Sequence, residues 1–239
     1  MEKFLFYLYK NNYSKNTIYA YKSSLNKYLK YINHKINKNS TKEYIIYLIH
    51  NYEPASVEFH KQVLIKYLKY LKIKWINIIN EIRTPKINRK LFKIINYYDF
   101  NKILKTVKHK THYQLFQLLY FTGIRISEIK KSSIQNNNLL VNGKGNKIRT
   151  VPLIFNLTKE EHHVLKAISR HNVYKYIHLY FDSWVTPHTF RRSFCTHLSK
   201  EGANIKIIQK LMGHSKLETT ASYMHFNEND IKKEINKYF

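Results

Sequence analysis

One tyrosine and a set of basic residues could together carry out chemistry on a phosphodiester without a metal ion. A tyrosine hydroxyl has an ordinary pKa of about 10, so it is a poor nucleophile until basic groups assist it. Arginines can hold the non-bridging oxygens of a phosphate, and a lysine can give a proton to the leaving oxygen. A single tyrosine among the 21 of this chain is usually packing or surface. The candidate catalytic residues are Arg125, Lys144, His188, Arg191, His214 and Tyr223.

The stretch LMGHSKLETTASYMHF, residues 211–226, contains the proposed nucleophile. Gly213 and His214 break one helical run and open the next, for which Ser215 is a plausible N-cap. Tyr223 follows His214 by nine residues. His188 and Arg191 lie three residues apart after a proline, so they share one face of a predicted helix.

Arg125 follows a glycine turn in TGIRISEI and begins a short predicted helix. A buried arginine is expensive to desolvate, so it needs an anionic partner. Glu128, three residues on, is the structural candidate. We expect Glu128 to orient this segment while Arg125 keeps donors free for a phosphate.

Residues 139–153, LLVNGKGNKIRTVPL, predict a β-hairpin with Lys144 between two glycines at its tip. A lysine at a loop tip is often only a backbone contact. It could equally be a general acid that reaches into a groove. His162 and His163 have no matched cysteine or carboxylate spacing, so we expect no metal and no cofactor.

The N-terminal part of the chain predicts helices and no strand, because it shows helical spacing of apolar residues without sustained alternation. Predicted helices cover residues 2–10, 14–30, 40–50 and 54–71, with Ser40 or Thr41 as the cap of the third. In the C-terminal part, Asp99 is the expected cap of a helix, and others are expected at 159–170, 188–201 and 205–212. We predict a helical unit at 1–83, a basic linker at 84–92 and a second unit at 93–239.

The composition favours a polyanionic partner. The formal net charge is +27, with a pI near 9.9, and both predicted units are basic. Part of this bias fits AT-rich coding, yet its sign still favours nucleic acid over a membrane surface. Cys195 is the only cysteine, which suggests a reducing compartment. No apolar run approaches the ~20 residues that span a bilayer, so we expect a soluble cytoplasmic protein.

The motifs quoted above, in their order, resemble those of the tyrosine recombinase or phage-type integrase family, especially its compact Xer-like members. TGIRISEI resembles the first arginine motif, GKGNKIRTVPL the lysine hairpin, HTFRRSFCTHL the His-x-x-Arg box, and LMGHSKLETTASYMH the box that holds the nucleophile. SKNTIYAY and residues 54–71 resemble the N-terminal core-binding domain. Arg192 departs from the pattern, since the family usually has a second histidine there.

The resemblance implies a mainly α fold with a small β-hairpin or sheet. A helical core-binding (SAM-like) domain would precede a mixed α/β catalytic domain. It implies the six candidate residues as the catalytic set, with Tyr223 forming a 3′-phosphotyrosine. It also implies double-stranded DNA as partner and a homotetramer on two DNA sites. A type IB topoisomerase-like enzyme and a catalytically idle helical DNA-binding regulator are the alternatives.

Overall fold

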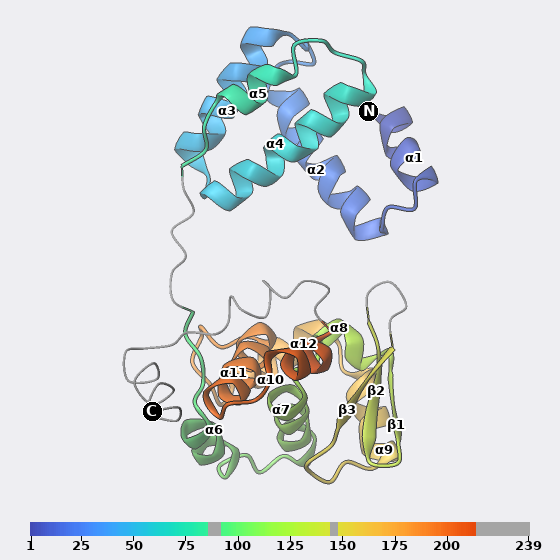
Figure 1. Ribbon diagram of the computed structural model, residues 1–239, viewed down its shortest axis with the longest axis vertical. Coiled ribbons are helices and arrows are strands. Elements are labelled where there is room, and N and C mark those ends of the chain that lie inside the picture. Colours follow the sequence, from blue (N-terminus) through green and yellow to red (C-terminus); the bar gives the residue numbers. More distant parts are fainter. Residues whose placement is uncertain (86–91, 144–147, 214–239) are drawn as a thin grey trace. The chain divides into compact units, whose positions relative to one another are not determined.

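The computed structural model describes residues 1–85, 92–143 and 148–213 (Figure 1). The chain divides into two compact units, Met1–Leu91 and Phe92–Phe239. The three described ranges are mainly helical with one small sheet, as the sequence predicted. Lys144, His214, Ser215 and Tyr223 lie outside the described residues.

Unit 1 is helical throughout its described part. Capping explains where its helices begin: the Ser14 side chain accepts from the backbone of Thr17, and Pro54 opens a later helix. The cap of the third helix is Asn37, not Ser40 or Thr41, because its side chain accepts from Ser40 N one turn earlier than expected. The helices are α1 (Glu2–Lys10), α2 (Lys15–Tyr31), α3 (Lys38–Asn51), α4 (Pro54–Tyr70) and α5 (Asn77–Glu81).

The core of unit 1 consists of aliphatic residues together with buried tyrosines. The Tyr28 and Thr41 hydroxyls lie 2.7 Å apart, and Ser24 Oγ lies 2.7 Å from His60 Nδ1. These hydrogen bonds satisfy polar atoms that would otherwise be costly to bury.

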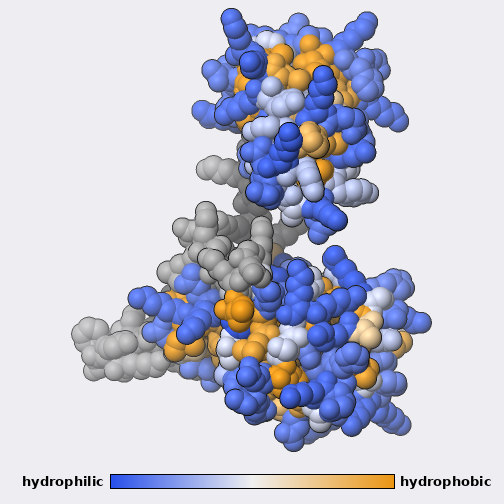
Figure 2. Space-filling model, turned by 90° about the vertical axis from the view of Figure 1, so that its right-hand side faces the viewer, coloured by the Kyte–Doolittle hydropathy of each residue, from blue (hydrophilic) through white to orange (hydrophobic). Residues whose placement is uncertain are grey.

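No helix in the described ranges is long and apolar enough to cross a membrane. Figure 2 shows hydrophilic side chains over most of the visible face of each unit.

Unit 2 combines helices with an antiparallel three-stranded sheet in the order β1-β2-β3. The hairpin prediction is confirmed: β2 (Asn138–Asn142) pairs with β3 (Ile148–Pro152), with Asn142 opposite Ile148. Strand β1 (Ser132–Gln135) was not predicted. The helices are α6 (Tyr97–Leu104), α7 (Lys110–Thr122), α8 (Ile126–Ile129), α9 (Lys159–Ala167), α10 (Arg170–His178), α11 (Pro187–Lys200) and α12 (Ile205–Met212).

Two helix predictions in unit 2 need correction. The cap of α6 is Asn96 instead of Asp99, since the Asn96 side chain accepts from Asp99 N at 2.8 Å. The helix expected at 159–170 is α9 alone, and it ends at Ala167. A separate helix, α10, begins at Arg170 behind its own cap, Ser169.

Helices α7 and α11 pack against each other at the centre of unit 2. Phe116 and Phe190 face one another with ring centroids 6.1 Å apart, and Phe100 stacks on Tyr120 at 3.8 Å. Burying aromatic rings of this size supplies a large share of the hydrophobic stabilisation. The packing fixes the C-terminal end of α7, which leads into the turn before Arg125, and the N-terminal half of α11, which carries Arg191.

Candidate active site

The turn at Gly123 positions the first arginine. Gly123 ends α7 with a φ of +57°, and a Cβ there would lie 2.5 Å from Phe194 Cδ1. Only glycine meets both demands at low cost. The chain then turns through Ile124 to Arg125, whose extended backbone caps α8.

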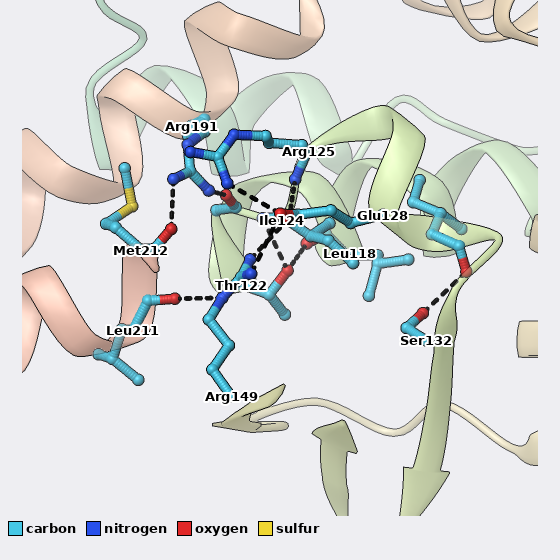
Figure 3. Close-up of polar contacts among 12 residues, drawn as sticks. Leu118, Thr122, Ile124, Arg125, Glu128, Ser132, Arg149, Arg191, Leu211 and Met212 are labelled. Atoms are coloured by element: carbon cyan, nitrogen blue, oxygen red, sulfur yellow. Dashed lines mark hydrogen bonds and ion pairs between the residues drawn. The ribbon is translucent and has the colours of Figure 1, made fainter. Parts of the chain in front are cut away.

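Glu128 is the anionic centre of the site and binds two arginines (Figure 3). Its carboxylate accepts from Arg125 Nη1 at 2.8 Å and from the Arg125 backbone N at 3.0 Å. The prediction that Glu128 pairs with Arg125 is confirmed. Burial raises the pKa of the Glu128 carboxyl, but hydrogen bonds from Arg149 and Arg125 outweigh this and lower the pKa to about 2.

Arg149 is a site residue that sequence reasoning missed. Its Nη2 and Nη1 donate to the two oxygens of Glu128 at 2.7 and 3.2 Å, and its Nε donates to the Leu211 carbonyl at 2.8 Å. It is only 8% exposed. The sequence held a signal for it, because Arg149 lies two residues before the apolar Val151 on the same strand and therefore shares its covered face.

Arg191 lies on α11 and is almost completely buried. Its Nη1 donates to the Gly123 carbonyl and its Nη2 to the Met212 carbonyl. Arg191 therefore holds the last residues of α7 and α12 together. Arg149 ties β3 to α12 through the Leu211 carbonyl, one residue before Met212. A Cβ on Gly213 would lie 3.1 Å from the Arg149 side chain.

Three of the six candidate catalytic residues lie in the described ranges, and they line one cavity of about 270 Å³. They are Arg125, His188 and Arg191. Arg125 enters from the start of α8, while His188 and Arg191 come from the first turns of α11. Figure 3 shows Arg125 and Arg191 next to each other. The cavity is lined by Arg125, Ile126, Ser127, Lys130, Ile168, Arg170, Pro187, His188 and Arg191.

The electrostatics of this cavity suit an anion. Partial burial lowers the pKa of His188, and the neighbouring Arg192, Arg191, Arg125 and Arg170 lower it further. A lowered pKa keeps this imidazole neutral near pH 7, so it can accept a hydrogen bond or a proton. In the ranges that the structure describes, no group of three metal-binding side chains gathers.

Comparisons with known proteins agree with this fold and site. The phage integrase family model matches residues 177–230, which include His188, Arg191, His214 and Tyr223. A tyrosine recombinase of Pseudothermotoga lettingae is 29% identical over 72% of this chain and 69% of its own length. The tyrosine recombinase XerD of Staphylococcus epidermidis is 31% identical over 64% of each chain.

A solved structure of the Tn1549 transposon integrase in complex with circular intermediate DNA shares the fold. It has a TM-score of 0.66 at 17% identity, covering 95% of both chains. The family model and the curated relatives indicate an enzyme of the class that breaks and rejoins DNA. The chain is similar to the tyrosine recombinases, or phage integrases, of the Xer type. It spans between 64% and 69% of the length of these two curated relatives.

Proposed function

We propose that this protein is a site-specific recombinase that cleaves and rejoins double-stranded DNA through a covalent 3′-phosphotyrosine and exchanges strands between two DNA sites. The observation that carries the proposal is the cationic cavity that Arg125, His188 and Arg191 line together. Relatives bearing the name tyrosine recombinase, and a neighbour solved with DNA, support the reaction and the partner.

The two arginines bind the reacting phosphate in this proposal. Arg125 gives Nη1 to Glu128, which leaves further guanidinium donors for the non-bridging oxygens. Arg191 adds a second positive charge next to it. Donors already fixed in place stabilise the charge that develops in the transition state without reorganising, which is the task that metal ions perform elsewhere.

Tyr223 is the nucleophile. Its oxygen forms a bond to phosphorus while the bond from phosphorus to the 5′ oxygen breaks, and Lys144 protonates the leaving oxygen. The proton of Tyr223 passes to a neutral histidine, either His188 or His214. Because the phosphotyrosine conserves the bond energy, a 5′ hydroxyl from a second duplex can reverse the step and join the strands.

Strand exchange between two duplexes requires several active sites, so we infer a homotetramer on two DNA sites. A type IB topoisomerase-like enzyme would run the same chemistry on one duplex. A catalytically idle regulator would bind DNA without forming an adduct. Native gel electrophoresis with two differently labelled duplexes separates these candidates, since only the recombinase holds both in one complex.

The direct test uses nicked suicide duplexes tiled across the DNA that flanks the coding sequence of this protein. Wild-type protein should become covalently attached to one of them in denaturing gels, in the presence of EDTA. Tyr223→Phe should bind that duplex with unchanged affinity and form no adduct, because only the hydroxyl is lost. An adduct that persists in Tyr223→Phe would assign the nucleophile to another residue. Loss of adduct in EDTA, restored by magnesium, would contradict the metal-free mechanism.

A further inference from the structure

The cavity holds more positive charge than one phosphodiester requires. Arg125 and Arg191 already exceed the single negative charge of a DNA phosphate. Two more cations line the same cavity from other elements: Arg170 at the start of α10, and Lys130 directly after α8. None of the lining residues that the structure describes is acidic. Cations gathered in this way repel each other until an anion binds.

Arg170 occupies a position that is unfavourable for a cation. It is the first residue of α10, where the unpaired backbone N–H groups carry partial positive charge. Among the described residues it has no ion pair, and its guanidinium lies 5.8 Å from the ring centroid of Tyr174. The fold therefore gains little from the Arg170 charge, which points to an anion from outside the protein.

Arginine is rare in this chain and gathers near the cavity, which supports an external anion as the partner of Arg170. Only seven of the 42 Lys and Arg residues in the chain are arginines, and five of them lie at or beside the cavity. Four of these have a partner within the protein. Arg125, Arg149 and Arg191 donate to carboxylate or main-chain oxygens, and Arg192 lies over the ring of Phe92. A planar guanidinium binds two oxygens of one group, which lysine does not. These five are Arg125, Arg149, Arg170, Arg191 and Arg192.

We propose that Arg170 forms a second phosphate subsite, which binds the DNA backbone phosphate adjacent to the one that is cleaved. The inference rests on the proposed function, since it takes the phosphate at Arg125 and Arg191 as the reacting one. Arg170 is then a positioning residue that fixes the register of the strand in the cavity. Its loss should weaken DNA binding by about one phosphate contact.

The first experiment compares the full-length wild type with Arg170→Ala and with Lys175→Ala. Lys175 is an exposed cation on the same helix that does not line the cavity, so it is the matched control. The probe is a fluorescein-labelled DNA duplex of mixed sequence, about three helical turns long, titrated by anisotropy over a salt series. Arg170→Ala should bind roughly tenfold more weakly at low salt. Its log–log salt slope should be smaller by about 0.9, the value for one phosphate contact. Lys175→Ala should match the wild type.

The second experiment locates the phosphate. Neutral methylphosphonates replace the phosphates flanking the cleavage position one at a time, in the suicide duplex that forms the adduct. In the wild type, one neighbouring replacement should weaken binding, and in Arg170→Ala that same replacement should have no further effect. Arg170→Lys should restore the salt slope but only part of the affinity.

The results separate this inference from the function on which it rests. Equal affinities and slopes for Arg170→Ala and Lys175→Ala, with normal adduct formation, would overturn the subsite alone. The subsite would also be overturned if the binding losses from Arg170→Ala and from methylphosphonate replacement added together at every phosphate position. A wild type that binds DNA but forms no adduct would overturn the proposed function, while the salt series would still measure whether Arg170 contacts a phosphate. Absence of DNA binding by the wild type would overturn both.

Discussion

Glu128 holds two arginines at once, and one of them is buried. Glu128→Gln keeps the shape of the side chain but removes the charge, leaving Arg149 buried without an anion. We expect a loss of roughly 3–5 kcal/mol in the free energy of unfolding at about pH 7, measured by urea denaturation. Glu201→Gln, on an exposed side chain at the end of α11, is the control and should change little.

The pH dependence of this loss tests its cause. The pKa of Glu128 is lowered to about 2, so its contribution to stability is present above the ordinary carboxyl pKa and is lost as pH falls toward 2. The difference between wild type and Glu128→Gln should therefore shrink steadily below about pH 4.5. A difference that stays constant down to about pH 2 would mean that the carboxylate charge is not what stabilises the site.

Lys144 is the residue for which two interpretations remain open. If it is the general acid, Lys144→Ala should slow cleavage on the order of 10²–10⁴-fold while binding stays close to wild type. A suicide duplex with sulfur in place of the leaving 5′ oxygen should restore the rate, because a thiolate leaves without a proton. Arg125→Ala should gain nothing from sulfur, since Arg125 acts on the non-bridging oxygens. Failure of sulfur to rescue Lys144→Ala would make the lysine a DNA contact.

The turn between α7 and α8 depends on Gly123. Gly123→Ala and Gly202→Ala both place a Cβ at positive φ, but nothing lies within 4 Å of a Cβ at Gly202. The backbone cost is thus common to both variants, and only Gly123→Ala also displaces Phe194. We expect Gly123→Ala to lose about 1–3 kcal/mol more in the free energy of unfolding. Equal losses would show that the contact with Phe194 relaxes freely.

The sequence predicted the elements that have strong local signals, and missed those that depend on distant partners. The hairpin was predictable because two short runs rich in apolar and β-branched residues flank a turn with two glycines. Strand β1 was not, because its residues SSIQ show no apolar alternation. Ser132 is buried, and its hydroxyl is satisfied by partners outside the strand: it donates to the Ile129 carbonyl at 2.8 Å and lies 2.9 Å from His162 Nε2.

The contacts of the candidate site also divide into local ones, which were predictable, and long-range ones, which were not. The pairing of Arg125 with Glu128 is local, so helical spacing predicted it. The pairing of Glu128 with Arg149 joins a helix to a strand 21 residues later, and that of Arg191 with the Gly123 carbonyl spans 68 residues. Contacts at such separations depend on how α7, α11 and the sheet pack together. That packing cannot be deduced from the local residue patterns of a single sequence.

The two units have separate hydrophobic cores. The buried residues of unit 1 and those of unit 2 form distinct clusters, without a shared member in the described ranges. We therefore expect two transitions when the full-length protein is heated in a calorimeter. Leu64→Ala in unit 1 and Leu119→Ala in unit 2, both at fully buried positions, should each cost roughly 2–5 kcal/mol.

Independent unfolding of the two units is tested by assigning each thermal transition to one unit. Leu64→Ala should lower one transition temperature and leave the other in place, and Leu119→Ala should do the converse. If either substitution shifted both transitions by the same amount, or if a single transition were seen, the units would unfold cooperatively. That result would exclude independent folding of the two parts.

The hydrogen bonds of Arg191 bear on how inactive variants of this protein should be interpreted. Arg191 joins the final residues of α7 and α12 through two carbonyls, in addition to lining the cavity. Truncation to alanine would remove the phosphate ligand and also leave two buried carbonyls without their donor. A null phenotype from Arg191→Ala would thus mix a misassembled fold with lost chemistry. Tyr223→Phe, which removes a single oxygen, is the better dominant-negative reagent for trapping intact complexes in cells.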